Sequence, residues 1–244
     1  MLCFTAVIPH DTDLLHESAA ENQLTRRGIA VVGGELMASK PDVILILSSH
    51  AENFSDQYTL FFNTLFSAGA ALKKFGVISN AMRPAAVCFL AKLQSFARAH
   101  ALPLRSVQTT ALDVGSAVAL RLLKIPDTLP TAVIGSSSAR SILDHMETGY
   151  SLKDFIQNFP QRVAVIVTGE SEHNTDAEPP LATLLARRSV SALIALADRQ
   201  VRDCVSHPLA LCYGLLRGFP LVTRIHADEH NTRSALVTAT LFSA

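Results

Sequence analysis

The sequence predicts an α/β fold with a mostly parallel central sheet flanked by helices. Two runs, Val43–Leu47 and Arg162–Thr168, are almost continuously apolar and rich in β-branched residues, which is typical of strands buried on both faces. Short apolar runs alternate with longer helical patterns along the chain, as in a parallel sheet with crossover helices. No linker-like stretch divides the 244 residues, so we expect residues 1–244 to form a single domain.

Each element follows from a local pattern. The first strand ends where Pro9 interrupts an apolar run, and Pro84 is compatible with the first turn of a helix, where an N–H is not needed. The expected strands are Leu2–Ile8, Val43–Leu47, Tyr58–Phe62, Thr131–Ile134 and Arg162–Thr168. The expected helices are Glu21–Ser39, Pro84–His100, Ser138–Phe159, Pro180–Val205 (in one or two pieces) and Pro208–Leu216. Leu221–Ile225 and Ala235–Phe242 would close the sheet as an antiparallel pair.

Composition excludes several classes of protein. Apolar residues make up 49% of the chain, enough for a large core, and 21 basic residues balance 21 acidic ones. This balance argues against a general electrostatic role at nucleic acids or membrane surfaces. No run approaches the roughly 18 apolar residues of a membrane span. The four cysteines form no C-x-x-C pair, and scattered thiols fit a reducing compartment, so we expect a soluble cytoplasmic protein.

Three histidines follow predicted strands closely. Pro9-His10 comes after the first strand, Ser48-Ser49-His50 after the second, and His173 lies five residues beyond Thr168. Open α/β sheets bind ligands beyond the carboxyl ends of their strands, so parallel strands would bring the three imidazoles to one edge. Imidazole is the commonest metal ligand in proteins and the usual acid or base near neutral pH.

The residues alone leave four readings open. Two histidines with a carboxylate suit a non-haem Fe(II) centre, whereas three histidines suit zinc and hence a hydrolase. A protein that binds a metal and acts through redox chemistry or through partners is a third reading. A metal-free α/β module, in which His10, His50 and His173 are loop or capping residues, is the fourth.

These motifs, in this order and strand context, resemble the class III extradiol dioxygenases. This is the family of LigB-type catalytic subunits of aromatic ring-cleaving dioxygenases, and it includes the Memo proteins. Pro9-His10, Ser48-Ser49-His50 with Phe54-Ser-Asp56, and Gly169-Glu-Ser-Glu-His173 are similar to its Pro-His, Ser-x-His and Gly-Asp-x-Ser-His motifs. Asp203-Cys204-Val-Ser-His207-Pro resembles the family's Glu-Cys-Gly stretch and the Cys-Gly-Arg-His-Pro of Memo.

The resemblance implies a site as well as a fold. His10 and His50 would bind Fe(II), or another divalent metal such as zinc or copper, and His173 would be the acid/base catalyst. The third metal ligand would be Asp203 by analogy with ring-cleaving members or Cys204 by analogy with Memo, with Glu229 a weaker candidate. The substrates would be a small catecholic aromatic compound and O2, and the protein would form a dimer or a higher assembly.

The chain departs from the ring-cleaving members in two places. Their Asp-His-Gly, whose histidine faces the substrate, corresponds here to Asp113-Val114-Gly115, and valine cannot form that hydrogen bond. Their Glu-Cys-Gly has become Asp203-Cys204-Val205, with a shorter carboxylate. The motifs taken together predict an extradiol dioxygenase. The two departures give the alternative, a Memo-like metal-binding protein that cleaves no ring.

Overall fold

The computed structural model describes residues 1–16, 22–51, 54, 56–172, 180–198, 203–219, 221–230 and 234–243. Within these residues nine strands form one sheet, in the order β10-β11-β1-β8-β2-β7-β3-β6, with β9 paired to β11. The strands are β1 (Leu2–Ile8), β2 (Val43–Ser48), β3 (Tyr58–Phe62), β6 (Leu104–Gln108), β7 (Thr131–Gly135), β8 (Val163–Thr168), β9 (Ser171–Glu172), β10 (Arg224–His230) and β11 (Ser234–Ser243). A separate hairpin joins β4 (Leu65–Ser67) to β5 (Met82–Pro84).

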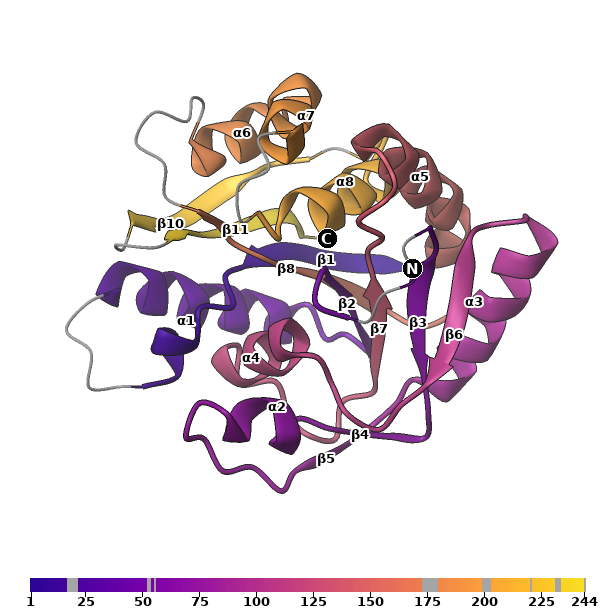
Figure 1. Ribbon diagram of the computed structural model, residues 1–244, viewed down its shortest axis with the longest axis horizontal. Helices are drawn as coiled ribbons and strands as arrows, with labels where there is room; N and C mark the ends of the chain where they lie inside the picture. Colours follow the sequence, from indigo (N-terminus) through magenta and orange to yellow (C-terminus); the bar gives the residue numbers. More distant parts are fainter. Residues whose placement is uncertain are drawn as a thin grey trace.

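Helices cover both faces of this sheet. They are α1 (Gln23–Ala38), α2 (Gly69–Lys73), α3 (Val87–Ala99), α4 (Val114–Leu122), α5 (Ile142–Asn158), α6 (Leu181–Arg187), α7 (Val190–Asp198) and α8 (Ser206–Leu215), with a 3-10 turn η1 (Thr12–Leu15). Figure 1 shows α1, α2 and α4 on one side of the strands and α5 to α8 on the other. None of the helices in the described ranges is long and apolar enough to cross a membrane.

The centre of the sheet is parallel, as predicted. Strand β1 pairs in parallel with β8, β8 with β2, and β2 with β7. The register aligns their last residues, because Thr168 lies opposite both Ile8 and Ser48, and Ser48 lies opposite Gly135. The carboxyl ends of these four strands therefore meet along one line, which we call the carboxyl edge.

The strands of this centre are fully buried. Every residue of β1, β2, β7 and β8 is buried, which explains why their sequences are apolar almost throughout. On the face covered by α5 and α8 the two helices cross closely at glycines. A methyl group added at Gly149 would lie only 1.9 Å from the carbonyl oxygen of Leu211, and one at Gly214 would meet Met146 equally closely. Only glycine allows this approach.

The structure resolves one open choice, and other predicted boundaries were wrong. The segment Pro180–Val205 forms two helices, α6 and α7, which was one of the two expected arrangements. The helices separate where Arg188 adopts a left-handed conformation with φ 51°, and residues 203–205 precede a new helix. Helix α5 begins at Ile142 rather than Ser138, since Ser141 and Asp144 form a capping box. The strand expected at Leu221–Ile225 begins at Arg224 and extends to His230.

Candidate metal centre

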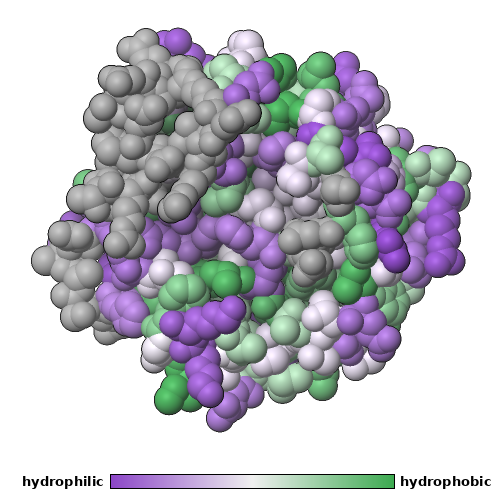
Figure 2. All heavy atoms as spheres, in the orientation of Figure 1, coloured by the Kyte–Doolittle hydropathy of each residue, from purple (hydrophilic) through white to green (hydrophobic). Residues whose placement is uncertain are grey.

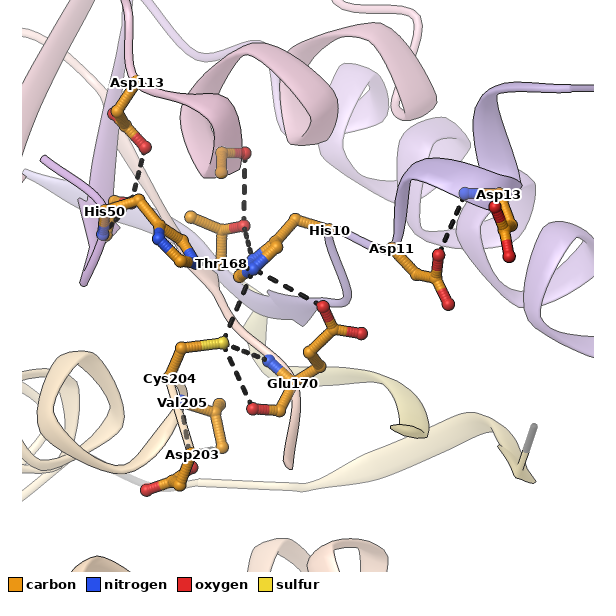
Figure 3. Close-up of polar contacts among 12 residues, drawn as sticks. His10, Asp11, Asp13, His50, Asp113, Thr168, Glu170, Asp203, Cys204 and Val205 are labelled. Atoms are coloured by element: carbon orange, nitrogen blue, oxygen red, sulfur yellow. Dashed lines mark hydrogen bonds and ion pairs between the residues drawn. The ribbon is translucent and has the colours of Figure 1, made fainter. Parts of the chain in front are cut away.

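Three predicted residues meet at the carboxyl edge. His10 lies two residues beyond β1, His50 two residues beyond β2, and Cys204 in the segment that leads into α8. The Nε2 atoms of His10 and His50 are 3.0 Å apart, and Cys204 Sγ lies 3.4 Å from His10 Nε2. One donor atom from each residue lies within 4.8 Å of the other two, and this is the one such group of three in the described part of the chain. Figure 3 shows the three side chains pointing toward one another.

The donor separations fit ligands of a single metal ion. Two nitrogens at about 2.1 Å from one ion lie about 3.0 Å apart when they subtend a right angle. A nitrogen at about 2.1 Å and a thiolate sulfur at about 2.3 Å lie roughly 3.1 to 3.6 Å apart between right-angled and tetrahedral geometry. The observed 3.0 Å and 3.4 Å match these values. Two imidazoles and one thiolate are borderline-to-soft donors that suit iron, zinc or copper.

A hydrogen-bond chain fixes the tautomer of His10. Thr168 Oγ1 donates to the carbonyl oxygen of Gly115 at 3.2 Å and lies 3.1 Å from His10 Nδ1. A carbonyl can only accept, so the single hydroxyl hydrogen of Thr168 goes to Gly115. The oxygen of Thr168 must therefore accept from the Nδ1–H of His10. This tautomer leaves the lone pair of His10 on Nε2, the nitrogen that faces His50 and Cys204.

Ser48 and Asp113 hold the backbone of His50 in place. Its N–H donates to Ser48 Oγ at 3.2 Å, and Ser48 Oγ donates in turn to Asp113 Oδ1 at 2.7 Å. Asp113 also caps α4 by accepting from the N–H of Ser116 at 3.0 Å. Gly115 allows this approach, because a methyl group there would lie 2.9 Å from Ser48 Oγ. The start of α4 thus supports both histidines, through Asp113 and through the carbonyl of Gly115.

Burial sets the charge states of the donors. His10 is 5% exposed, and this burial, with a smaller contribution from His50, lowers the pKa of His10 to about 3. The ring is therefore neutral at neutral pH and available as a ligand. Burial raises the pKa of Cys204 to about 12, so in the absence of a cation the thiol is protonated. A metal ion bound there would displace that proton.

Glu170 belongs to this site and was missed from the sequence. The backbone N–H of Glu170 donates to Cys204 Sγ at 3.3 Å, and its carbonyl accepts from the Cys204 thiol at 3.2 Å and from the Cys204 N–H at 3.1 Å. Its carboxylate Oε1 lies 3.6 Å from His10 Nε2. The available signal was a carboxylate two residues beyond β8, in the same segment as His173.

The other predicted ligands lie elsewhere. Asp203 Oδ1 accepts from the N–H groups of Val205 and Ser206 at 3.1 and 3.3 Å, and Figure 3 shows its carboxylate directed away from His10. Burial raises the pKa of the Asp203 carboxyl. Glu229 Oε2 accepts from the N–H and hydroxyl of Thr25 at 3.0 and 2.8 Å, which ties β10 to α1. The predicted catalyst His173 lies outside the described residues.

Val114 is the residue that the sequence resemblance matches to a substrate-facing histidine. It is the first residue of α4 and packs, half-buried, against the apolar core. Its side chain offers no polar atom to a ligand. The flanking Asp113 and Gly115 keep the supporting contacts described above, so the structure retains the scaffold of this motif without its central imidazole.

Comparison with known proteins agrees with this picture. Residues 4–187 match the family model described as the catalytic LigB subunit of aromatic ring-opening dioxygenase. A solved structure of an uncharacterised protein from Escherichia coli K12, JW3007, has the same fold, with a TM-score of 0.68 and 14% sequence identity. The alignment covers 98% of this chain and 100% of that one. No curated protein matches the chain. Cys204 lies beyond the end of the family match.

Proposed function

Because the chain belongs to the family of catalytic LigB subunits of aromatic ring-opening dioxygenases, we propose that it is an Fe(II)-dependent oxidoreductase. Its proposed reaction is extradiol cleavage of a small catecholic aromatic compound by O2. The observation that carries the proposal is the convergence of His10, His50 and Cys204 at the carboxyl edge, with a lone pair of His10 aimed at the other two donors. We also propose a cytoplasmic location, where a free thiol such as Cys204 stays reduced, and a homo-oligomeric state.

Each residue of the site has a role in the proposed reaction. His10, His50 and Cys204 would hold the iron, which when bound would supply binding of the catechol and of O2 and electron transfer between them. Thr168 and Gly115 keep His10 in the ligating tautomer. His173, in the role that the family assigns it, would take a phenolic proton and return it as the ring opens. Imidazole suits that role because it exchanges protons near neutral pH.

Metal content is the first test. We expect one iron per chain after anaerobic purification, and loss of that iron in His50→Ala because one of three donors is removed. His100→Ala is the matched control, since His100 is an exposed histidine at the end of α3. Iron that persists in His50→Ala, or chains that take up no metal when Fe(II) is supplied, would overturn the proposed centre.

Oxygen consumption with a panel of catechols is the second test. The proposal expects uptake of one O2 per ring opened, with a new absorbance from the conjugated product. In His173→Ala we expect the iron to remain and turnover to be lost, which separates a proton-transfer role from metal binding. Normal turnover in His173→Ala would refute the role given to this residue.

Cys204 and Val114 favour a second candidate, a Memo-like metal-binding protein without ring cleavage. A thiolate stands where ring-cleaving relatives have a carboxylate, and Val114 replaces a substrate-facing histidine. This candidate predicts stoichiometric iron, zinc or copper and no oxygen uptake from any catechol. Oxygen uptake that depends on His50 would exclude it.

A further inference from the structure

A cavity lies away from the metal centre. It has a volume of about 830 Å³ and opens between α1, the turn η1 and the end of α4. Figure 1 shows α1 and α4 side by side on the same face of the sheet. None of His10, His50, Glu170 and Cys204 lines this cavity. Its volume falls within the range of about 300 to 1,000 Å³ that is usual for small-molecule sites.

Part of the cavity wall is apolar. Leu14 and Leu15 of η1, Met37 of α1 and Leu122 of α4 contribute hydrocarbon side chains. On the α1 side the cavity is lined by the small residues Ala30, Gly33 and Gly34, which project little into it. A methyl group added at Gly34 would meet no heavy atom within 4 Å, so the space above this residue is open. A hydrocarbon chain can therefore lie along α1 in contact with these leucine and methionine side chains.

The described charged groups of the cavity carry the same sign. Arg26, Arg121 and Lys124 line it, and among the residues that the structure describes no aspartate or glutamate does so. Two carboxylates close to these cations in sequence are engaged elsewhere. Glu35 accepts from Thr240 and lies 3.5 Å from Arg224, and Asp127 pairs with Arg83 at 2.8 Å. Three cations gathered on an apolar hollow of a chain with no net charge favour an anionic ligand.

Arg26 is held in place by backbone carbonyls. Its guanidinium donates to the carbonyl oxygens of Asp13 at 3.0 Å and of Leu14 and His16 at 2.5 Å each. These neutral partners fix the side chain without cancelling its charge. In the described residues its Nε atom is buried without a hydrogen-bond partner. The cation is therefore preorganised at the wall of the cavity.

We propose that this cavity is a second ligand site, which binds an amphipathic monoanion with a linear hydrocarbon chain. The anionic headgroup would lie among Arg26, Arg121 and Lys124, and the chain would lie against Leu15, Met37 and Leu122. Figure 2 shows hydrophilic and hydrophobic residues intermixed over this view of the molecule. The site is independent of the reaction proposed above.

Matched amphipaths test the proposal on the full chain. Decanoate is titrated against dansylated undecanoate as a fluorescent probe, below the micelle concentration, and decyltrimethylammonium is titrated in parallel. We expect saturable 1:1 binding of the probe, displacement by decanoate, and at least tenfold weaker displacement by the cation. Equal displacement by both amphipaths, or no saturable binding, would overturn the proposal.

Two variants locate the site. Gly34→Leu fills the open space above α1 and should abolish binding while leaving the protein folded, because leucine is the better helix former. Arg121→Glu should weaken decanoate binding at least tenfold, and Arg98→Glu on α3 is the charge-matched control that should not change it. Iron content should be unchanged in all three variants. Wild-type binding in Gly34→Leu would refute the location.

Discussion

Replacement of Thr168 by valine gives a sharp test of the metal centre. Valine has nearly the shape of threonine but removes the hydroxyl that accepts from His10 Nδ1–H. A bound metal requires the lone pair on Nε2, so the hydrogen must stay on Nδ1, where it would have no acceptor in a site only 5% exposed. The metal-free protein escapes this penalty, because His10 can move its hydrogen to Nε2 and donate it toward His50, 3.0 Å away. The cost therefore falls on the metal-bound state alone.

The size of the effect follows from that asymmetry. A buried donor without an acceptor costs about 1–3 kcal/mol, and loss of an outer hydrogen bond to a ligating histidine lowers metal affinity about 10- to 100-fold. We expect Thr168→Val to lose this factor in competitive titrations of Fe(II) or Co(II) against a chromophoric chelator. Thr168→Ser keeps the hydroxyl and should bind within about threefold of wild type.

Thr5→Val is the matched control for this experiment. Thr5 is a buried threonine on the neighbouring strand β1, and its hydroxyl has no hydrogen-bond partner in the described residues. Its replacement should leave metal affinity unchanged. Wild-type affinity in Thr168→Val, or an equal loss in Thr168→Ser, would refute the reasoning about the tautomer of His10.

Three further predictions follow from the described contacts. Metal binding at pH 7 should release about one proton from Cys204, because the pKa of its thiol is raised to about 12. Metal binding to Cys204→Ser should release none. Calorimetry in buffers of different ionisation enthalpy measures the number of protons released. Burial lowers the pKa of His145 to about 4, from about 6.5 in the unfolded chain, so the unfolded chain binds a proton more readily than the folded protein. The contribution of His145 to the free energy of unfolding is therefore highest above pH 6.5 and falls as the pH decreases toward 4. Urea unfolding should show that His145→Leu reduces the stability loss between pH 7 and pH 5 by about 2 kcal/mol, and an unchanged loss would contradict this. Gly149→Ala should destabilise the fold by about 3 kcal/mol, because its methyl group would meet the Leu211 carbonyl. Gly34→Ala, at an open position of α1, should stabilise it by about 1 kcal/mol. Equal melting temperatures of the two variants would count against the close crossing of α5 and α8.

The central strands could be predicted because burial on both faces leaves a strong signal. Val43–Ser48 and Val163–Thr168 are apolar almost throughout, and the position of His10 and His50 beyond strand ends follows directly from that pattern. Strand β6 could not be predicted in this way. It lies at the edge of the sheet, and its residues Leu104–Gln108 are half-buried or exposed, so its sequence carries no clear alternation.

The supporting contacts of the site could not be predicted, because they depend on register and on local backbone direction. Thr168 looks like any strand residue until the fold places it beside Gly115, 53 residues away. Asp203 and Cys204 are adjacent in sequence, yet the side chain of Asp203 accepts from the backbone N–H groups of Val205 and Ser206, whereas that of Cys204 faces His10. Residue type alone could not decide between them. Helix α4 was not predicted either, although its capping residue Asp113 is a good start signal.

The position of β1 in the sheet has a consequence for how the protein reaches its active form. This strand, the first of the sheet in sequence order, lies between β8 and β11, whose residues come more than 150 positions later. His10 and Cys204 are likewise separated by 194 positions. Such long-range pairings make folding slow, because distant parts of the chain must meet before these contacts form. A nascent chain can therefore offer a metal ion only scattered single ligands, and uptake of the metal should report completion of the whole sheet.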